Sequence, residues 1–293
     1  MRKQYSELSE YVKSIVKEAK AGKKSSLSTG LKTLDRFSGG IRPGELVIIA
    51  SRPGVGKSAL ALSMAMNMAY GTNPVPVGFF SMEMSGTELT ECVISNKGKI
   101  NLISLKSYSK DEDTIRRLSA VAGQLLMSPV NIYICDERRQ KISDFIIRVR
   151  RMVNENNVKA VFVDSISTLG SGGYSSNNVR HEYLPMVVKR LKQIACELNI
   201  SVICTCHVNE SGAIRAPMLE DIRDADLIVR DADLIILLDD PSLRIEMKRE
   251  KGNDSPERKF RKVFIAKQRN GMTGMFHLRF LPEYARFEEN QFS

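Results

Sequence analysis

The sequence predicts an α/β fold: a mostly parallel, twisted sheet with helices on both faces and an antiparallel hairpin at its C-terminal edge. Short apolar runs alternate with helix-length amphipathic segments, the runs are rich in β-branched residues, and the last two flank a turn-like sequence. Such runs suit strands of a parallel sheet, which helices cover on both faces. A chain of 293 residues is long enough for one large domain with a short appendage, and too short for two.

The expected parallel strands are six apolar runs, bounded by turn or helix signals. They are Glu45–Ala50, Val77–Ser81, Val130–Asp136, Val158–Asp164, Ile200–Cys206 and Asp233–Leu238. Two later runs, Lys262–Gln268 and Gly274–Arg286, flank the sequence RNGMT, which is typical of a hairpin turn. They predict an antiparallel edge on the parallel core, as is common in large sheets.

The first 26 residues form a separate predicted unit, ahead of a single domain at 27–293. Within residues 5–20, apolar side chains recur at spacings of three and four, which predicts an amphipathic helix. The sequence AGKKSS at 21–26 then indicates a flexible linker. The apolar stripe of this helix packs either on its own domain or on a neighbouring subunit, and the sequence leaves both open.

Composition narrows the class of protein. The formal net charge of +10 favours an anionic partner such as nucleic acid. The five cysteines are scattered without the CxxC spacing of a zinc site, which indicates buried thiols in a reducing compartment. The N-terminus is polar and charged, unlike a signal peptide, and no apolar run is long enough to cross a bilayer. These features predict a cytoplasmic protein with no membrane partner.

A phosphate-binding loop is the strongest motif. The sequence SRPGVGKS at 51–58 joins an apolar strand to an apolar helix. A glycine-rich turn in that context lets backbone N–H groups converge on phosphate oxygens. Lys57 is then expected to reach the β- and γ-phosphates of ATP, and the Ser58 hydroxyl to bind Mg²⁺. Ser51 stands where the pattern usually has glycine. The predicted nucleotide-binding residues are Arg52, Pro53, Gly54, Val55, Gly56, Lys57, Ser58 and Ala59.

Two acids follow later strands and complete a site for hydrolysis. Asp164 closes an apolar run, where it is expected to hold the Mg²⁺ shell through water. Glu83 follows the strand after the phosphate-loop helix, at the strand end that faces the ligand crevice of parallel α/β sheets. Ser85 and Glu88 form a predicted capping box for the next helix. Glu83 is therefore free to orient the attacking water.

At this point the motifs resemble the C-terminal motor domain of the DnaB-type replicative helicases, over roughly residues 27–290. The segment Ser28–Leu31 resembles the entry to that domain and is shared with the KaiC and RadA groups. Arg52-Pro53 inside the phosphate loop and the segment Phe80–Ser85 are closer to the DnaB-type pattern. The most specific match is Ala266–Gly274, nearly identical to A-K-Q-R-N-G-P-T-G. The resemblance implies a RecA-like P-loop NTPase core.

The resemblance also implies roles. Glu83 becomes the catalytic base, and Lys267 and Arg269 on the late hairpin reach the neighbouring subunit's ATP site, where an arginine stabilises charge on the γ-phosphate. The family forms hexameric rings that hydrolyse ATP at subunit interfaces and move 5′ to 3′ on single-stranded DNA, with primase and a loader as replication partners. The implied catalytic residues are Lys57, Glu83, Asp164, His207, Lys267 and Arg269.

Two segments depart from the family pattern. Cys206–Glu210 replaces S-Q-L-N-R, so that His207 stands where the family has a glutamine that senses the γ-phosphate. A histidine also donates to phosphate, although its charge depends on pH. Asp221–Asp226 replaces D-L-R-E-S-G, and Asp226 adds a negative charge where DNA is expected to pass. Repulsion there weakens nucleic-acid binding.

The expected DNA contacts lie in Gly170–Arg180, Asn209–Pro217 and the segment around Asp224. The first two follow strands and are rich in Gly, Ser and Asn, as functional loops are. Contacts to backbone phosphates give affinity without sequence readout. The predicted contact residues are Arg180, Arg215, Arg223 and Asp224. The alternatives to a helicase motor are a KaiC- or RadA-like regulator or recombination factor, and a helicase loader or inhibitor.

Overall fold

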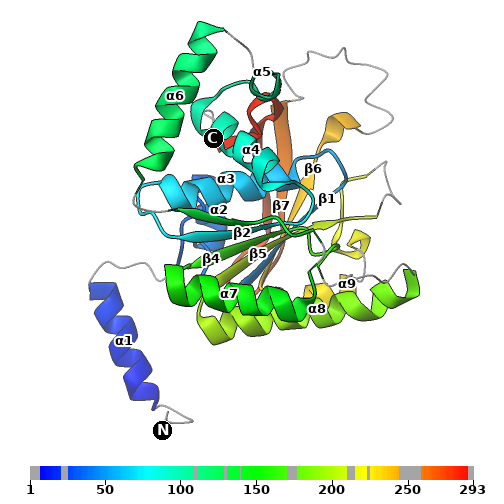
Figure 1. The fold of residues 1–293 in the computed structure, drawn as a ribbon. Helices are drawn as coiled ribbons and strands as arrows, with labels where there is room; N and C mark the ends of the chain where they lie inside the picture. Colours follow the sequence, from blue (N-terminus) through cyan, green and yellow to red (C-terminus); the bar gives the residue numbers. More distant parts are fainter. Residues whose placement is uncertain are drawn as a thin grey trace.

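The computed structural model describes residues 7–20, 26–107, 111–128, 131–138, 140–169, 177–209, 215–222, 225–243 and 259–289. Within them the chain forms one nine-stranded sheet in the order β3-β2-β4-β5-β1-β6-β7-β8-β9 (Figure 1). The strand that leads into the phosphate loop, β1, lies at the centre of the sheet, between β5 and β6. The predicted α/β fold with a parallel core is confirmed.

The strands from β1 to β6 pair in parallel, and those from β7 to β9 extend the sheet in antiparallel fashion. Their bounds are Leu46–Ser51 (β1), Val77–Ser81 (β2), Ile132–Cys135 (β3), Ala160–Asp164 (β4), Ser201–His207 (β5), Leu234–Asp239 (β6), Phe260–Gln268 (β7), Gly274–Leu281 (β8) and Arg286–Glu289 (β9). The predicted run Gly274–Arg286 is broken after Leu281 by a 3₁₀ turn that begins at Pro282. Proline has no N–H to donate to a strand ladder, which explains the break.

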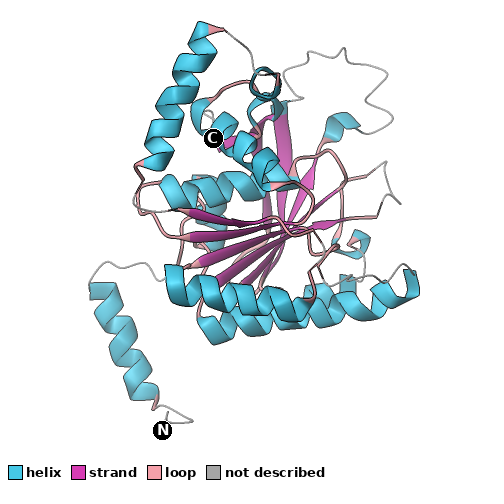
Figure 2. Ribbon diagram, viewed as in Figure 1, coloured by secondary structure: helices cyan, strands magenta, loops and turns pink. Residues whose placement is uncertain are grey.

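Helices cover both faces of the sheet, as Figures 1 and 2 show. Alternate residues of β1 serve the two faces: Val47 and Ile49 belong to the core under α3, and Ile48 and Ala50 to the core over α7 and α8. The helices are Leu8–Lys20 (α1), Lys32–Ser38 (α2), Lys57–Tyr70 (α3), Gly86–Gly98 (α4), Leu102–Lys106 (α5), Glu112–Leu126 (α6), Ile142–Asn156 (α7), Asn177–Leu198 (α8) and Ala225–Asp231 (α9).

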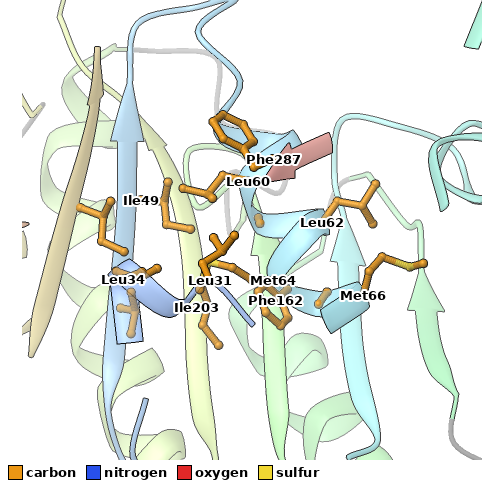
Figure 3. Close-up of a cluster of buried hydrophobic side chains, with 14 of the residues drawn as sticks. Leu31, Leu34, Ile49, Leu60, Leu62, Met64, Met66, Phe162, Ile203 and Phe287 are labelled. Carbon is orange, nitrogen blue, oxygen red and sulfur yellow. The ribbon is translucent and has the colours of Figure 1, made fainter. Parts of the chain in front are cut away.

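The helix α3 is buried on most of its surface. Leu60, Leu62, Met64 and Met66 are all buried in the first core, which Figure 3 shows together with Ile49. A helix that is apolar all round must be enclosed by protein. Its contacts with the parallel strands and with β9 fix the direction of its N-terminus, where the phosphate loop ends.

The predicted amphipathic helix near the N-terminus is present as α1, and the domain boundary at residue 26 stays a prediction. Its described apolar side chains are exposed, with Leu8 at 78% and Ile15 at 65%. Figure 1 shows α1 apart from the sheet and its covering helices. Tyr5 and residues 21–25 of the predicted linker lie outside the described residues. Among the described helices, none has the length and apolar character needed to cross a membrane.

Candidate nucleotide-binding and catalytic site

The phosphate loop joins β1 to α3 as predicted, with Ser51 ending the strand and Lys57 beginning the helix. Gly54 and Gly56 take positive φ values of 77° and 113°, which favour glycine. A Cβ at Gly56 would also lie 3.2 Å from the rings of Phe280 and Phe287. Because the N-cap residue Gly56 has no side chain, the first N–H groups of α3 receive no side-chain cap. They are available to an anion such as phosphate.

A buried arginine, Arg261, forms a hydrogen bond to the backbone of the phosphate loop. The Arg261 Nε atom donates to the Val55 carbonyl oxygen at 3.1 Å, and its Nη2 atom lies 2.9 Å from Asp240 Oδ2. Its guanidinium also stacks over the Phe280 ring at 4.9 Å. Burial lowers the pKa of Arg261, and the charges of Asp240 and Asp239 oppose that shift. No sequence motif marks Arg261, which lies just before the predicted strand Lys262–Gln268, and an arginine is ordinarily a surface side chain.

A cavity of about 240 Å³ opens beside the loop. It continues from the phosphate-binding residues to apolar side chains on the β2–α4 turn, on α4 and ahead of β9. The lining residues are Gly54, Gly56, Lys57, Ser58, Ala59, Leu62, Met84, Cys92 and Ala285. Apolar walls beside a polar end suit a ligand with a ring and a charged group. No sequence motif marks Cys92 or Ala285, which meet Met84 only through the fold.

Asp164 ends β4 next to the phosphate loop and is 1% exposed. The Thr205 hydroxyl on the adjacent strand donates to Asp164 Oδ1. Burial raises the pKa of Asp164, while hydrogen bonds from Thr205 and Ser58 and the charge of Lys57 lower it. Within the described part of the chain, the buried Oδ2 atom has no hydrogen-bond partner.

This arrangement fits Mg²⁺. A hard cation prefers oxygen ligands, and Mg²⁺ typically takes only one or two from protein carboxylates while phosphates and waters supply the rest. Asp164 Oδ2 and the Ser58 hydroxyl are oxygen donors beside the phosphate loop. No cluster of three or more His, Cys, Asp or Glu side chains occurs among the described residues, so a metal here would depend on the bound phosphates.

Glu83 lies two residues beyond β2, at the same edge of the sheet. Ser165 Oγ donates to Glu83 Oε1 at 2.9 Å, and His207 Nε2 lies 3.6 Å from the same oxygen. The interaction with nearby His207 is the main cause that lowers the pKa of Glu83 to about 2; burial opposes it, and Lys57 and Ser165 lower the pKa further. The Glu83 carboxylate is therefore ionised at neutral pH and held in a fixed direction.

His207 is the last residue of β5 and pairs with Ser51 at the start of the phosphate loop. The structure thus brings Lys57, Glu83, Asp164 and His207 to one edge of the sheet. The predicted capping box is also present, since Glu88 Oε2 accepts from the Ser85 N–H at 2.8 Å and Ser85 Oγ accepts from the Glu88 N–H at 3.2 Å. Glu83 is therefore not consumed as a helix cap.

Lys267 and Arg269 lie at the end of the strands opposite to the phosphate loop. Gln268 pairs with Leu234 at the start of β6, whereas Ser51 pairs with Leu238 near its end. At about 3.3 Å per residue, this places the pair on the order of 13 Å from their own phosphate loop. The Lys267 ammonium donates to carbonyl oxygens at the end of α9, including Ala232 at 2.6 Å.

Arg269 is held by the same end of α9 and by the residue that precedes β6. Its Nη1 atom lies 3.2 Å from Asp233 Oδ1, and its Nη2 atom donates to the Arg230 carbonyl oxygen at 3.2 Å. Asp233 is itself buried and pairs with Lys192 at 2.6 Å. These contacts fix the base of the hairpin within its own subunit, so the action of Lys267 and Arg269 on a neighbouring site stays a prediction.

The predicted DNA contacts are largely outside the described residues. Arg223, Asp224 and the Arg180 side chain are among them, as are residues 170–176 and 210–214. Arg215 is described, and its guanidinium pairs with Asp221 at 2.7 and 2.9 Å. Asp226 is exposed in the first turn of α9. The assignment of these residues to DNA stays a prediction.

Comparison with known proteins places this geometry in a family. The family described as "DnaB-like helicase C terminal domain" matches residues 26–289. "Replicative DNA helicase DnaB" of Geobacillus stearothermophilus is 32% identical over 271 residues, which cover 91% of this chain and 57% of that protein. "Replicative DNA helicase DnaC" of Bacillus subtilis (strain 168) is 31% identical over 266 residues, covering 89% and 56%. The chain thus spans little more than half the length of these relatives.

Two solved structures share the fold at comparable identity. The "ATPase Domain of G40P" superimposes with a TM-score of 0.84 and 26% identity, covering 98% of this chain and 100% of that one. "The Structure Of A DnaB-Like Replicative Helicase And Its Interactions With Primase" gives a TM-score of 0.81 and 27% identity, covering 98% and 68%. With the phosphate loop, the acids at its edge and the late hairpin all in place, the chain belongs to the DnaB-like helicase C-terminal domain family.

Proposed function

We propose that this chain is the ATP-hydrolysing motor of a ring-forming replicative DNA helicase that moves 5′ to 3′ along single-stranded DNA. The observation that supports this most directly is that the predicted catalytic residues lie at two opposite ends of the parallel strands. Lys57, Glu83 and Asp164 surround the phosphate loop, while Lys267 and Arg269 lie at the far edge, beyond reach of their own site. Such a site is completed by a neighbouring subunit.

The residues at the phosphate loop have separable tasks in ATP hydrolysis. Lys57 binds the β- and γ-phosphates, and Ser58 and Asp164 would hold Mg²⁺, which neutralises charge on the phosphate oxygens. The ionised Glu83 carboxylate accepts a hydrogen bond from the attacking water and orients it toward the γ-phosphate. Ser165 and His207 keep Glu83 in that direction. The low pKa of Glu83 makes it a group that positions water more than one that binds a proton tightly.

We further propose a homo-hexamer in which the exposed face of α1 packs on an adjacent subunit. The exposed leucine, valine and isoleucine side chains of this helix form an apolar surface. Contact with a second protein surface would remove these side chains from water, which is favourable. Primase is a proposed replication partner, because one of the similar structures is printed with its primase interactions; a helicase loader and a cytoplasmic location also remain predictions. None of the comparisons favours the regulator, recombination-factor or loader alternatives.

Steady-state ATP hydrolysis, measured with and without single-stranded DNA over a range of protein concentrations, tests this function. Turnover per subunit should rise with protein concentration, because sites form between subunits, and rise again with DNA. A rate of ATP hydrolysis that is the same with and without DNA at every protein concentration would contradict the helicase function and favour the regulatory ATPase. In that case the exposed carboxylate of Asp226 is the first group to replace, by glycine.

Replacing Glu83 with Gln is expected to leave ATP binding within a few-fold of wild type and to slow hydrolysis by about a hundredfold or more. Glutamine keeps the shape and can still accept from Ser165, but it loses the charge that orients water. Binding of a fluorescent nucleotide and single-turnover hydrolysis separate the two effects. The same replacement at exposed Glu112 on α6 serves as the control. Unchanged turnover in the Glu83 variant would assign the water to another group.

The Glu83 carboxyl also predicts a dependence of stability on pH. Its pKa is lowered in the folded chain, so the stabilisation is complete above the ordinary carboxyl pKa of 4.5 and is lost as the pH falls toward about 2. Between pH 5 and pH 2, wild type should lose more melting temperature than Glu83→Gln, which has no carboxyl to protonate. Melting curves of the two chains over that range test this prediction. A difference in melting temperature that does not change with pH would contradict it.

Removing residues 1–20 is expected to weaken assembly, since it deletes the apolar face of α1. Sedimentation velocity should show a shift from rings toward smaller species at equal protein concentration. A matched control replaces exposed polar residues of α1, such as Lys13 and Lys17, by Ala and leaves the apolar face intact. An unchanged sedimentation profile after the deletion would show that α1 packs on its own domain.

A further inference from the structure

Two consecutive residues at the start of the phosphate loop contact two parts of the chain, Val208 beyond β5 and Arg215. The Ser51 carbonyl oxygen accepts from the Val208 N–H at 3.1 Å, just beyond the end of β5. The next residue, Arg52, donates through Nη2 to the carbonyl oxygen of Arg215 at 2.9 Å. The stretch Arg215–Ile222, called the anchor segment below, is therefore attached to the phosphate loop as well as to β5.

The two attachments differ in kind. The bond between Ser51 and Val208 joins two backbones that extend the β1–β5 ladder, so it is as fixed as the sheet. The bond from Arg52 is made by a long side chain whose own backbone lies in the phosphate loop. Its guanidinium is mostly buried and also lies 3.6 Å from Asp239 Oδ1, at the end of β6. This side chain is a direct contact between the phosphate loop and the Arg215 carbonyl oxygen.

The anchor segment is internally tied, so that a displacement of Arg215 moves it as one piece. Arg215 binds Asp221 through two nitrogens, at 2.7 and 2.9 Å. Asp221 Oδ2 also accepts from the Met218 N–H at 2.8 Å, and the Asp221 carbonyl oxygen accepts from the Asn209 N–H at 2.7 Å. A bridge between Val208 and Ile222 closes the unit against β5.

We propose that Arg52 is a positioning residue that couples the nucleotide state of the phosphate loop to the anchor segment, through its hydrogen bond to the Arg215 carbonyl oxygen. This inference rests on the proposed function, in which the chain hydrolyses ATP while it moves along DNA. The connection begins in the phosphate loop itself. Coupling of this kind is reciprocal: ATP changes the affinity for DNA by the same factor by which DNA changes the affinity for ATP.

Hydrogen exchange of the full chain tests the connection without DNA. In wild type, a saturating non-hydrolysable ATP analogue with Mg²⁺ should slow exchange of the amides in Arg215–Ile222 by about fivefold or more, the lower end of ordinary coupling between sites. In Arg52→Gln, whose side chain is shorter and uncharged, the same amides should exchange equally with and without the analogue. Nucleotide affinity is measured first for each variant, so that saturation is assured.

A second variant changes the other end of the connection and leaves the phosphate loop untouched. Asp221→Asn removes the negative charge and one of the two oxygens that accept from Arg215. It should remove the nucleotide effect on exchange while nucleotide affinity stays at wild type. Arg42→Lys, at an exposed position before β1, is the control and should respond like wild type. A nucleotide effect that survives in both Arg52→Gln and Asp221→Asn, or that is absent from wild type, overturns the proposal.

Binding of a fluorescent oligo-dT strand, with the ATP analogue or with ADP, extends the test to DNA. In wild type the DNA affinities in the two nucleotide states should differ by about fivefold or more. In Arg52→Gln and Asp221→Asn this difference should be smaller. A wild-type chain that binds no DNA in either state contradicts the proposed function. The exchange experiment still decides the role of Arg52 in that case, because it contains no DNA.

Discussion

Replacing Lys57 with Ala should reduce ATP turnover to the background of the assay. Lys57 begins α3 and is 8% exposed, so its ammonium acts in a site from which most water is excluded, where a charge is worth far more than in bulk solvent. Alanine removes both the binding of the phosphates and the stabilisation of charge that develops during transfer. Phosphate release, measured at saturating ATP and Mg²⁺, gives the effect directly.

The control for this variant is Lys32→Ala, at an exposed position in the first turn of α2, which should hydrolyse ATP like wild type. Melting curves should show both variants folded, because alanine is a good helix former and the core under α3 is unchanged. Turnover retained in folded Lys57→Ala would remove the phosphate loop from the mechanism, and with it the assignment of Ser58 and Asp164 to Mg²⁺.

Replacing Arg269 with Ala should lower ATP turnover by about a thousandfold or more, the usual effect of losing an arginine supplied in trans. The loss is expected in the neighbouring subunit's site, because the β6–β7 register places Arg269 at the opposite end of the strands from its own phosphate loop. Mixing this variant with Lys57→Ala should therefore restore activity that neither has alone. Each Arg269→Ala phosphate loop that meets a Lys57→Ala neighbour receives an intact Arg269.

The mixing experiment needs a control for the hairpin's own structure. Arg269 contacts Asp233 and the end of α9, so a variant that misfolds the hairpin would also lose activity. Arg230→Ala, at an exposed position of α9, removes a nearby side chain but keeps the carbonyl oxygen that Arg269 contacts. It should remain active. No recovery at any ratio of Arg269→Ala to Lys57→Ala would show that the arginine acts within its own subunit or holds only the fold.

Much of the site is predictable from sequence because its chemistry is local. The phosphate loop needs a strand, a glycine-rich turn and a helix in succession, and apolar runs ending in an acid mark Asp164 and Glu83. The residues that hold these acids are set by pairing between distant strands. Thr205 meets Asp164 only because β4 and β5 are parallel neighbours, in the register that pairs Val163 with Cys204. A serine after a strand, as Ser165 is, is too common to indicate a role.

The same limit applies to charged residues in strands. Arg261 is buried against Asp240 and the Val55 carbonyl oxygen, although an arginine ordinarily predicts a solvated side chain. Its burial depends on β8 and β9 being added outside β7, which the single predicted run Gly274–Arg286 did not separate. The position of Lys267 and Arg269 relative to the phosphate loop is likewise a matter of register, which the sequence of the hairpin does not contain.

Under the proposed function, the placement of those two cations also determines which assemblies can be active. Each subunit presents a donor edge, with Arg269, and an acceptor edge, with Lys57, on opposite ends of its parallel strands. A two-fold symmetric dimer brings like edges together and completes no site, whereas head-to-tail contacts complete one site each. An open row of subunits always has one acceptor edge unserved. Only closure of this row of subunits into a ring gives every subunit a complete site. This arrangement favours rings over two-fold dimers.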